Sequence, residues 1–157
     1  MNELFLNRAR TVAVTGHRVL QSDFNINKLK EKLLAFIEKG FDTFLVGMAL
    51  GFDTACFKVL QEIRKEKEIK IIACIPCLSQ PYKFNKKQKE EYDLMLSSAD
   101  EKVLISEEYT KKCMQKRNEY MVDRASVVFA YIKRDFGGTA NTIKYAKKKE
   151  IPIVKYD

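Results

Sequence analysis

Three glycine-containing turns carry the residues of this sequence that are best suited to binding a charged ligand. Each turn follows a short apolar run: Thr15–Arg18 holds the only histidine, Gly47–Asp53 holds two glycines and an acid, and Gly137–Thr139 holds a glycine pair. Glycine allows tight backbone geometry, and free N–H groups at the start of a helix attract anions. Each turn can therefore present an anion-binding surface. Taken singly, each is also explained by ordinary loop chemistry, with Asp53 as a helix N-cap.

A polar segment at Cys113–Asp123, just ahead of a later apolar run, adds a candidate arginine. If this segment is helical, Arg117 shares a face with Tyr120 and Met121, and Asn118 lies beside it. A guanidinium group has the fork-shaped set of donors that phosphate favours, so Arg117 opposite the turns would suit an anionic ligand. The alternative is an ordinary exposed arginine.

Several kinds of site are not indicated. Neither G-x-G-x-x-G nor G-x-x-x-x-G-K-[ST] occurs, so the dinucleotide fingerprint and the P-loop are both absent from the sequence. Cys74 and Cys77 have the spacing of a redox pair or half a zinc site, but no second pair completes one. We expect Cys56, Cys74, Cys77 and Cys113 to be reduced and buried, and we expect no metal site and no cofactor.

The elements that must position these turns alternate between two patterns. Continuous apolar runs predict strands buried on both faces, and apolar residues at three- and four-residue steps predict helices between them. This alternation indicates an α/β domain with a mainly parallel sheet. The predicted strands cover 11–15, 43–47, 70–75, 102–106, 126–132 and 152–155; the predicted helices cover about 26–37, 55–63, 86–98, 111–124 and 139–149. An irregular loop at 74–84 could form one wall of a site.

The order of the strands follows from the position of a shared site. Ligands in open α/β sheets bind beyond the carboxyl ends of the strands. The first, second and fifth strands must be neighbours if their loops are to meet. We therefore predict the core order 3-2-1-5-6, with the fourth strand at the edge beside the third.

Length and composition describe an ordinary soluble globular chain. The 157 residues have a mass of 18.3 kDa, which fits one domain over residues 1–157, with 46% hydrophobic and 32% charged residues. No apolar run approaches the roughly 20 residues that a membrane-spanning helix needs. The N-terminal segment, residues 1–14, mixes charged with apolar residues and lacks a signal-peptide pattern, so we expect a cytoplasmic location and no membrane partner.

The net charge of +8, from 29 Lys+Arg against 21 Asp+Glu, raises the question of a nucleic-acid partner. The lysines are spread along the chain and interleaved with acids, which favours a solvated surface over a nucleic-acid stripe. A homodimer is a further expectation. In the predicted helix 86–98, Tyr92, Met95 and Leu96 form an apolar stripe that either packs on the sheet or pairs two copies of the chain.

The turns and the arginine segment together resemble the YpsA/YoqJ-like family of small bacterial and prophage proteins. That family belongs to the SLOG superfamily, with the LOG-type lysine-decarboxylase-like proteins and the Rossmann domain of DNA-processing protein A. The resemblance implies a single Rossmann-like three-layer domain. In it, the glycine turns at 47–53 and 136–142 would both contact one nucleotide or nucleotide-derived ligand. The candidate ligand-binding residues are Thr15, Gly16, His17, Arg18, Gly47, Gly51, Asp53, Arg117, Asn118, Gly137, Gly138, Thr139 and Thr142.

The resemblance to the LOG-type enzymes is incomplete at one catalytic position. Their P-G-G-x-G-T-x-x-E motif ends in an acid that takes part in cleaving an N-glycosidic bond, whereas Thr142 stands at that place here. A hydroxyl cannot replace a carboxylate in this chemistry. We therefore expect a sensor for an ADP-ribose- or NAD-like compound. The alternatives are a hydrolase that uses Asp53 or Asp123, and a nonspecific DNA-binding protein. A buried carboxylate near His17 would favour the hydrolase.

Overall fold

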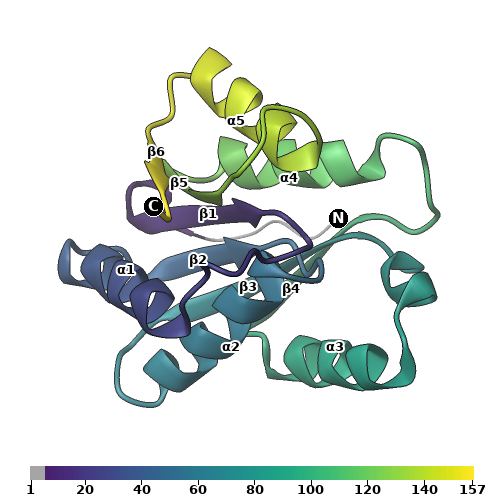
Figure 1. The fold of residues 1–157 in the computed structure, drawn as a ribbon, viewed down its shortest axis with the longest axis horizontal. Helices are drawn as coiled ribbons and strands as arrows, with labels where there is room; N and C mark the ends of the chain where they lie inside the picture. Colours follow the sequence, from purple (N-terminus) through teal and green to yellow (C-terminus); the bar gives the residue numbers. More distant parts are fainter. Residues whose placement is uncertain (1–5) are drawn as a thin grey trace.

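A six-stranded parallel sheet is the central layer of the computed structural model, which describes residues 6–157 (Figure 1). Residues 1–5, the start of the segment in which no signal peptide is expected, lie outside the described residues. The strand order is β4-β3-β2-β1-β5-β6, which confirms the predicted order and the position of β4 at the edge. The strands are β1 (Thr11–Gly16), β2 (Thr43–Val46), β3 (Lys70–Cys77), β4 (Glu101–Ser106), β5 (Val127–Tyr131) and β6 (Ile153–Lys155).

Five α-helices cover the two faces of the sheet. Figure 1 shows α1 (Ile26–Glu38), α2 (Phe52–Arg64) and α3 (Lys86–Ser98) on one face, and α4 (Cys113–Asp123) and α5 (Gly138–Lys148) on the other. Two apolar clusters fill the layers between helices and sheet, as a sheet buried on both faces requires. No helix among residues 6–157 is both long enough and apolar enough to span a bilayer.

The carboxyl ends of β1, β2 and β5 meet at one edge of the sheet because the strands are parallel neighbours. Val14 pairs with Val46 of β2 on one side, and Gly16 pairs with Tyr131 of β5 on the other. The first two turns follow directly from these strand ends, and the glycine pair at Gly137 follows β5 after a short loop. The expectation that the turns lie at the same edge of the sheet is therefore confirmed.

Strand β3 is longer than predicted and runs through Pro76 to Cys77. Beyond Ala73 the strand pairs only with β4, through Ile75 and Cys77, because β2 has already ended. Pro76 therefore costs no hydrogen bond of the ladder, and the extension is possible despite the proline. A short 3₁₀ helix, η2 (Gln80–Lys83), follows the strand; another, η1 (Arg8–Arg10), precedes β1.

The apolar stripe of α3 belongs to the core. Tyr92 and Met95 are buried and Leu96 is partly buried against the same cluster. The stripe is thus not a free surface for pairing two copies of the chain. All four cysteines are buried and free, as expected.

Aromatic packing fixes the loop between β1 and α1. Tyr131 stacks on Phe52 at 5.4 Å between ring centroids, and its hydroxyl accepts a hydrogen bond from the Gln21 N–H at 3.0 Å. The Tyr156 hydroxyl accepts from the Asn25 N–H at 2.7 Å. These bonds to side chains from β5 and from beyond β6 hold the loop that begins with the histidine of the first turn.

Candidate ligand-binding site

A cavity of about 460 Å³ opens at the carboxyl edge of the sheet, where the turns after β1, β2 and β5 meet. Its volume lies within the range of about 300–1,000 Å³ that is usual for small-molecule sites. The cavity collects side chains and backbone from the β1–α1 loop, the β2–α2 turn, α2, α4 and the start of α5. Its lining comprises Val14, Thr15, Gly16, His17, Arg18, Val19, Ala49, Asp53, Met114, Arg117, Asn118, Arg134, Gly138 and Thr139.

His17 is buried and held in one tautomer. Its Nε2 accepts a hydrogen bond from the Lys133 backbone N–H at 2.8 Å, so the proton of the neutral ring lies on Nδ1. Burial, and to a smaller extent the charge of Arg134, lowers the pKa of His17 below its usual value of 6.5. At neutral pH the imidazole is therefore uncharged, and it joins the β1 turn to the segment after β5.

Two exposed arginines contribute positive charge to the cavity, in addition to the buried Arg117. Arg18 and Arg134 both line it, both are exposed, and neither forms an ion pair with any of residues 6–157. Arg134 lies over the ring of Phe136 at 5.0 Å and its Nε donates to the Phe136 carbonyl at 3.3 Å. The two guanidinium groups retain donors for an anionic ligand.

The N-terminus of α5 adds a second source of positive potential. Gly137 is its N-cap, with φ of 97°, and no side chain caps the first turn; Gly138 and Thr139 line the cavity. The first N–H groups of a helix have no partner within the helix, and the helix dipole makes this end positive. Thr142 does not reach the cavity, because its hydroxyl donates back to the Gly138 carbonyl at 2.8 Å.

Asp53 is a buried carboxylate in the wall of the cavity, 5% exposed. Its Oδ2 accepts from the Ala49 N–H at 3.2 Å, whereas the buried Oδ1 has no hydrogen-bond partner among the described residues. Burial raises the pKa of Asp53 to about 6, against smaller opposing effects of Arg117, the Ala49 N–H and Arg18. A substantial fraction of this carboxyl group is therefore protonated near pH 6.

Arg117 lines the cavity and is not the ordinary exposed arginine that was the alternative, but its donors are already engaged by the protein. It is 5% exposed, and its Nη1 donates to the Gly47 carbonyl and to the Cys74 carbonyl at 3.5 Å. Its Nε donates to Asn118 Oδ1 at 2.8 Å. The side chain thus joins α4 to the turn after β2 and to the interior of β3. Arg117→Ala would remove these buried hydrogen bonds, including the one that Asn118 Oδ1 accepts, so it is a test of stability and not a clean test of binding.

Gly47 and Gly51 serve close packing behind the cavity. A Cβ atom on Gly47 would lie 2.8 Å from Cζ of Arg117. Gly51 has φ of 80°, and a Cβ there would lie 2.2 Å from the Arg18 carbonyl oxygen. Of the predicted residues, these two glycines, Gly137 and Thr142 do not line the cavity. The cavity brings together Thr15, Gly16, His17, Arg18, Asp53, Arg117, Asn118, Gly138 and Thr139.

Asp123, the other carboxylate considered for hydrolysis, lies outside the site. It is exposed at the end of α4 and accepts a hydrogen bond from the Tyr145 hydroxyl at 2.7 Å.

The sequence analysis did not identify Arg134 as a site residue, although its position shortly before the glycine pair could have indicated it. It also missed Ala49 and Met114, which offer no polar signal. No group of three or more His, Cys, Asp or Glu within residues 6–157 is arranged to hold a metal ion.

The fold and the cavity define a Rossmann-like α/β protein with a polar pocket at the carboxyl edge of its sheet. The chain belongs to the YspA SLOG family, whose model matches residues 13–156. It is 36% identical over 141 residues to the uncharacterized SPbeta prophage-derived protein YoqJ of Bacillus subtilis (strain 168), covering 77% of this chain and 81% of that protein. It is 24% identical over 160 residues to a UPF0398 protein of Bacillus thuringiensis (strain Al Hakam), covering 94% and 87%.

Two solved structures share the fold. DNA processing protein A from Streptococcus pneumoniae superposes with a TM-score of 0.70 at 18% identity, over 94% of this chain and 50% of that protein. DNA processing protein A from Helicobacter pylori, described for its single-stranded DNA binding mode, gives a TM-score of 0.66 at 16% identity, over 92% and 64%. The chain thus spans about half of the Streptococcus protein and less than two thirds of the Helicobacter protein.

Proposed function

We propose that the protein binds a nucleotide-derived small molecule, such as an ADP-ribose- or NAD-like compound, in the cavity at the sheet edge, as a sensor or regulatory protein in the cytoplasm. The observation that carries this proposal is the convergence of Arg18, Arg134 and the uncapped N-terminus of α5 on one cavity. Helix N-termini and arginine side chains both bind phosphate through several N–H donors. A phosphate group at Gly138 and Thr139 would receive donors from both.

Asp53 supports a ligand that carries hydroxyl groups as well as phosphate. A buried acceptor without a partner is costly, and a hydrogen-bond donor on the ligand would satisfy Oδ1 if the Asp53 side chain turned toward the cavity. Ribose presents such hydroxyl groups next to its phosphate. Arg18, Arg134 and the N-terminus of α5 would bind the phosphate, and Asp53 would accept from a hydroxyl group. The cavity therefore favours a sugar phosphate over a simple inorganic anion.

Calorimetry with ADP-ribose, NAD, AMP and cyclic nucleotides tests the proposal. Gly138 is the position of choice for a variant, because a Cβ there meets nothing within 4 Å. Gly138→Asp places a negative charge where the phosphate would lie, and we expect the affinity to fall at least tenfold, by about 1.4 kcal/mol or more.

Gly138→Asn is the matched control, because it has nearly the same shape and no charge. We expect it to retain most of the affinity of the wild-type protein. Equal losses in both variants would indicate a steric effect, and a wild-type protein that gives no heat with any ligand would refute the proposal.

A second candidate function is hydrolysis of a nucleotide N-glycosidic bond, favoured by the burial of Asp53 in the same cavity as His17. A carboxyl group with a pKa of about 6 can donate or accept a proton near neutral pH. Chromatography of the calorimetry mixtures for free base separates the two functions. Release of base that is abolished by Asp53→Asn would establish the hydrolase, and intact ligand would establish binding alone.

DNA binding has less support in the charge distribution. On α2 and α3 several cations are paired with acids, including Lys58 with Glu91 at 2.8 Å and Lys89 with Asp93 at 2.7 Å. Such pairs reduce the net field that a phosphate backbone would meet. The Helicobacter neighbour nevertheless makes nucleic acid a partner that an experiment must separate from a free nucleotide.

A further inference from the structure

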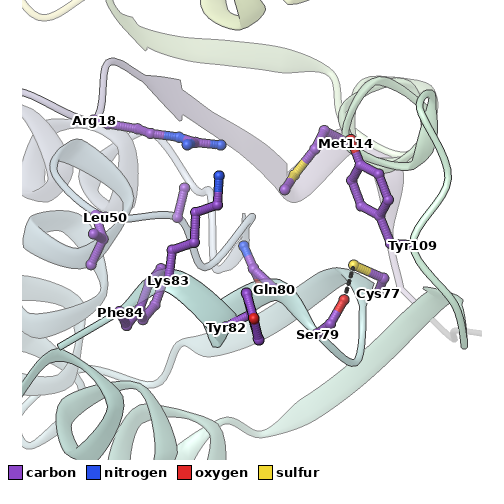
Figure 2. A pocket seen from close by; sticks show the side chains of 11 residues that line it. Arg18, Leu50, Cys77, Ser79, Gln80, Tyr82, Lys83, Phe84, Tyr109 and Met114 are labelled. Atoms are coloured by element: carbon purple, nitrogen blue, oxygen red, sulfur yellow. Dashed lines mark hydrogen bonds between the residues drawn. The ribbon is translucent and has the colours of Figure 1, made fainter. Parts of the chain in front are cut away.

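A second cavity of about 510 Å³ adjoins the first, and Arg18, Ala49 and Met114 line both (Figure 2). Most of its remaining lining comes from the loop after β3 that was expected to form one wall of a site. Its lining is more apolar than that of the first cavity. Aromatic and apolar side chains dominate, namely Leu50, Tyr82, Phe84, Tyr109 and Met114, with Lys83 among them.

We propose that this second cavity binds the flat heterocyclic base of the ligand whose phosphate lies in the first cavity, an inference that rests on the function proposed above. Bases stack on aromatic rings and on the planes of arginine side chains. Tyr82 is 83% exposed and Tyr109 is 64% exposed, so both have ring surface free for such contact. The ligand is then a nucleotide that extends across both cavities, and not a free sugar phosphate.

Charge at the junction of the two cavities supports this placement. In the view of Figure 2 the side chain of Lys83 extends toward the guanidinium end of Arg18, and both residues line the second cavity. Neither forms an ion pair with any of residues 6–157. Arg18 also lies near the Asp53 carboxyl group, where its charge opposes the rise in pKa that burial causes. Lys83 adds another cation to the lining of the second cavity. A phosphate of the ligand at this point would be attracted by both cations.

The floor of the second cavity is already organised for a ligand. Gln80 accepts a hydrogen bond from the Tyr92 hydroxyl at 3.1 Å and donates to the Gly47 carbonyl at 3.0 Å. Phe84 packs edge-on against Tyr92 at 5.7 Å between centroids. These contacts hold η2 against the core, so binding a base need not order the loop, which lowers its entropic cost.

The test compares AMP with ribose 5-phosphate, which differ only by the base. For the wild-type protein we expect AMP to bind at least tenfold more tightly in calorimetry. In Tyr82→Ala and Tyr109→Ala, and more so in the double variant, this ratio should fall toward one, because the affinity for AMP decreases while that for ribose 5-phosphate does not. Leu94→Ala, which removes an apolar side chain that is 70% exposed and lines neither cavity, is the control and should keep the full ratio.

Each other outcome overturns a defined part of the proposal. If ribose 5-phosphate binds as tightly as AMP, or if the tyrosine variants keep the ratio, the base does not occupy the second cavity, and the function proposed for the first cavity stands. If the wild-type protein binds neither compound, both proposals fail. If the tyrosine variants weaken only binding of a short single-stranded oligonucleotide, with a steep salt dependence, the occupant is nucleic acid and not a free nucleotide.

Discussion

At the scale of single residues, ionisation of the buried Asp53 in the site lowers the free energy of unfolding. Its pKa in the folded protein, about 6, lies above the ordinary value of 3.8 because burial penalises the charged form of the carboxyl group. Folding is thus most favourable when the group is protonated. The contribution of protonated Asp53 to the free energy of unfolding is fully present below about pH 4. It is lost as the pH rises through about 6, and it is absent at higher pH. A buried carboxylate kept at such a cost is typical of functional sites.

Asp53→Asn should therefore stabilise the protein at neutral pH. The amide keeps an acceptor for the Ala49 N–H and never ionises, so the free energy of unfolding should rise by at most about 3 kcal/mol at pH 7.5. The gain should shrink between pH 6 and pH 4 and vanish below it. Urea unfolding at several pH values measures this, with Asp135→Asn at an exposed position as the control. A variant less stable than the wild type at pH 7.5 would show that Arg117 needs the negative charge.

At the scale of elements, the β1–α1 loop and the start of α2 are packed backbone against backbone. The Phe52 N–H donates to the His17 carbonyl at 3.1 Å, and Gly51 leaves room for the Arg18 carbonyl beside it. This contact sets the position of the cavity wall that carries Arg18. The precision of the site therefore depends on a glycine that does not itself contact the cavity.

Gly51→Ala should be much more destabilising than Gly40→Ala. Both glycines have positive φ, 80° and 102°, so both alanines pay about 1–2 kcal/mol of backbone strain. Only Gly51 also has a carbonyl within 2.2 Å of the added Cβ, whereas nothing lies within 4 Å at Gly40. Thermal unfolding should show a decrease in Tm for Gly51→Ala that is at least twice that for Gly40→Ala. Similar decreases would mean that the loop moves aside freely.

The sequence predicted the elements better than it predicted the roles of the site residues. Continuous apolar runs and helical periodicity are local patterns, so the strands, the helices and the strand order were recovered, and with them the meeting of three turns. The burial of Arg117 could not be predicted, because it depends on a carbonyl 70 residues away in the chain. The sequence also could not predict the direction of the Thr142 hydroxyl. A threonine in a helix can donate to the carbonyl four residues earlier, as Thr142 does to Gly138, or point away from the helix.

At the scale of the whole molecule, α3 is attached to the core by the stripe that had suggested a homodimer. Met95 is buried and Leu94, its neighbour in the chain, is 70% exposed. The two positions therefore separate the core face of α3 from its outer face. A homodimer remains a prediction, and it would have to use a surface other than this stripe.

Met95→Glu should unfold or strongly destabilise the chain, because it buries an unpaired charge, at a cost of about 3–5 kcal/mol. Leu94→Glu should change the free energy of unfolding by no more than about 0.5 kcal/mol. Circular dichroism with thermal unfolding measures both, and light scattering at several concentrations gives the mass of each species. A folded Met95→Glu protein that is monomeric where the wild type is dimeric would restore the stripe as an interface.

The carbonyl oxygen of Gly47 accepts hydrogen bonds from two segments that serve different cavities, Arg117 of α4 and Gln80 of η2. A shift of Arg117 toward an occupant of the first cavity would weaken one of these two bonds. We therefore expect the two cavities to be coupled through this oxygen atom, and such coupling is reciprocal, so that a group held in either cavity would alter the affinity of the other by the same factor. A ligand that places one group in each cavity would then bind with an affinity that the two groups measured separately do not give.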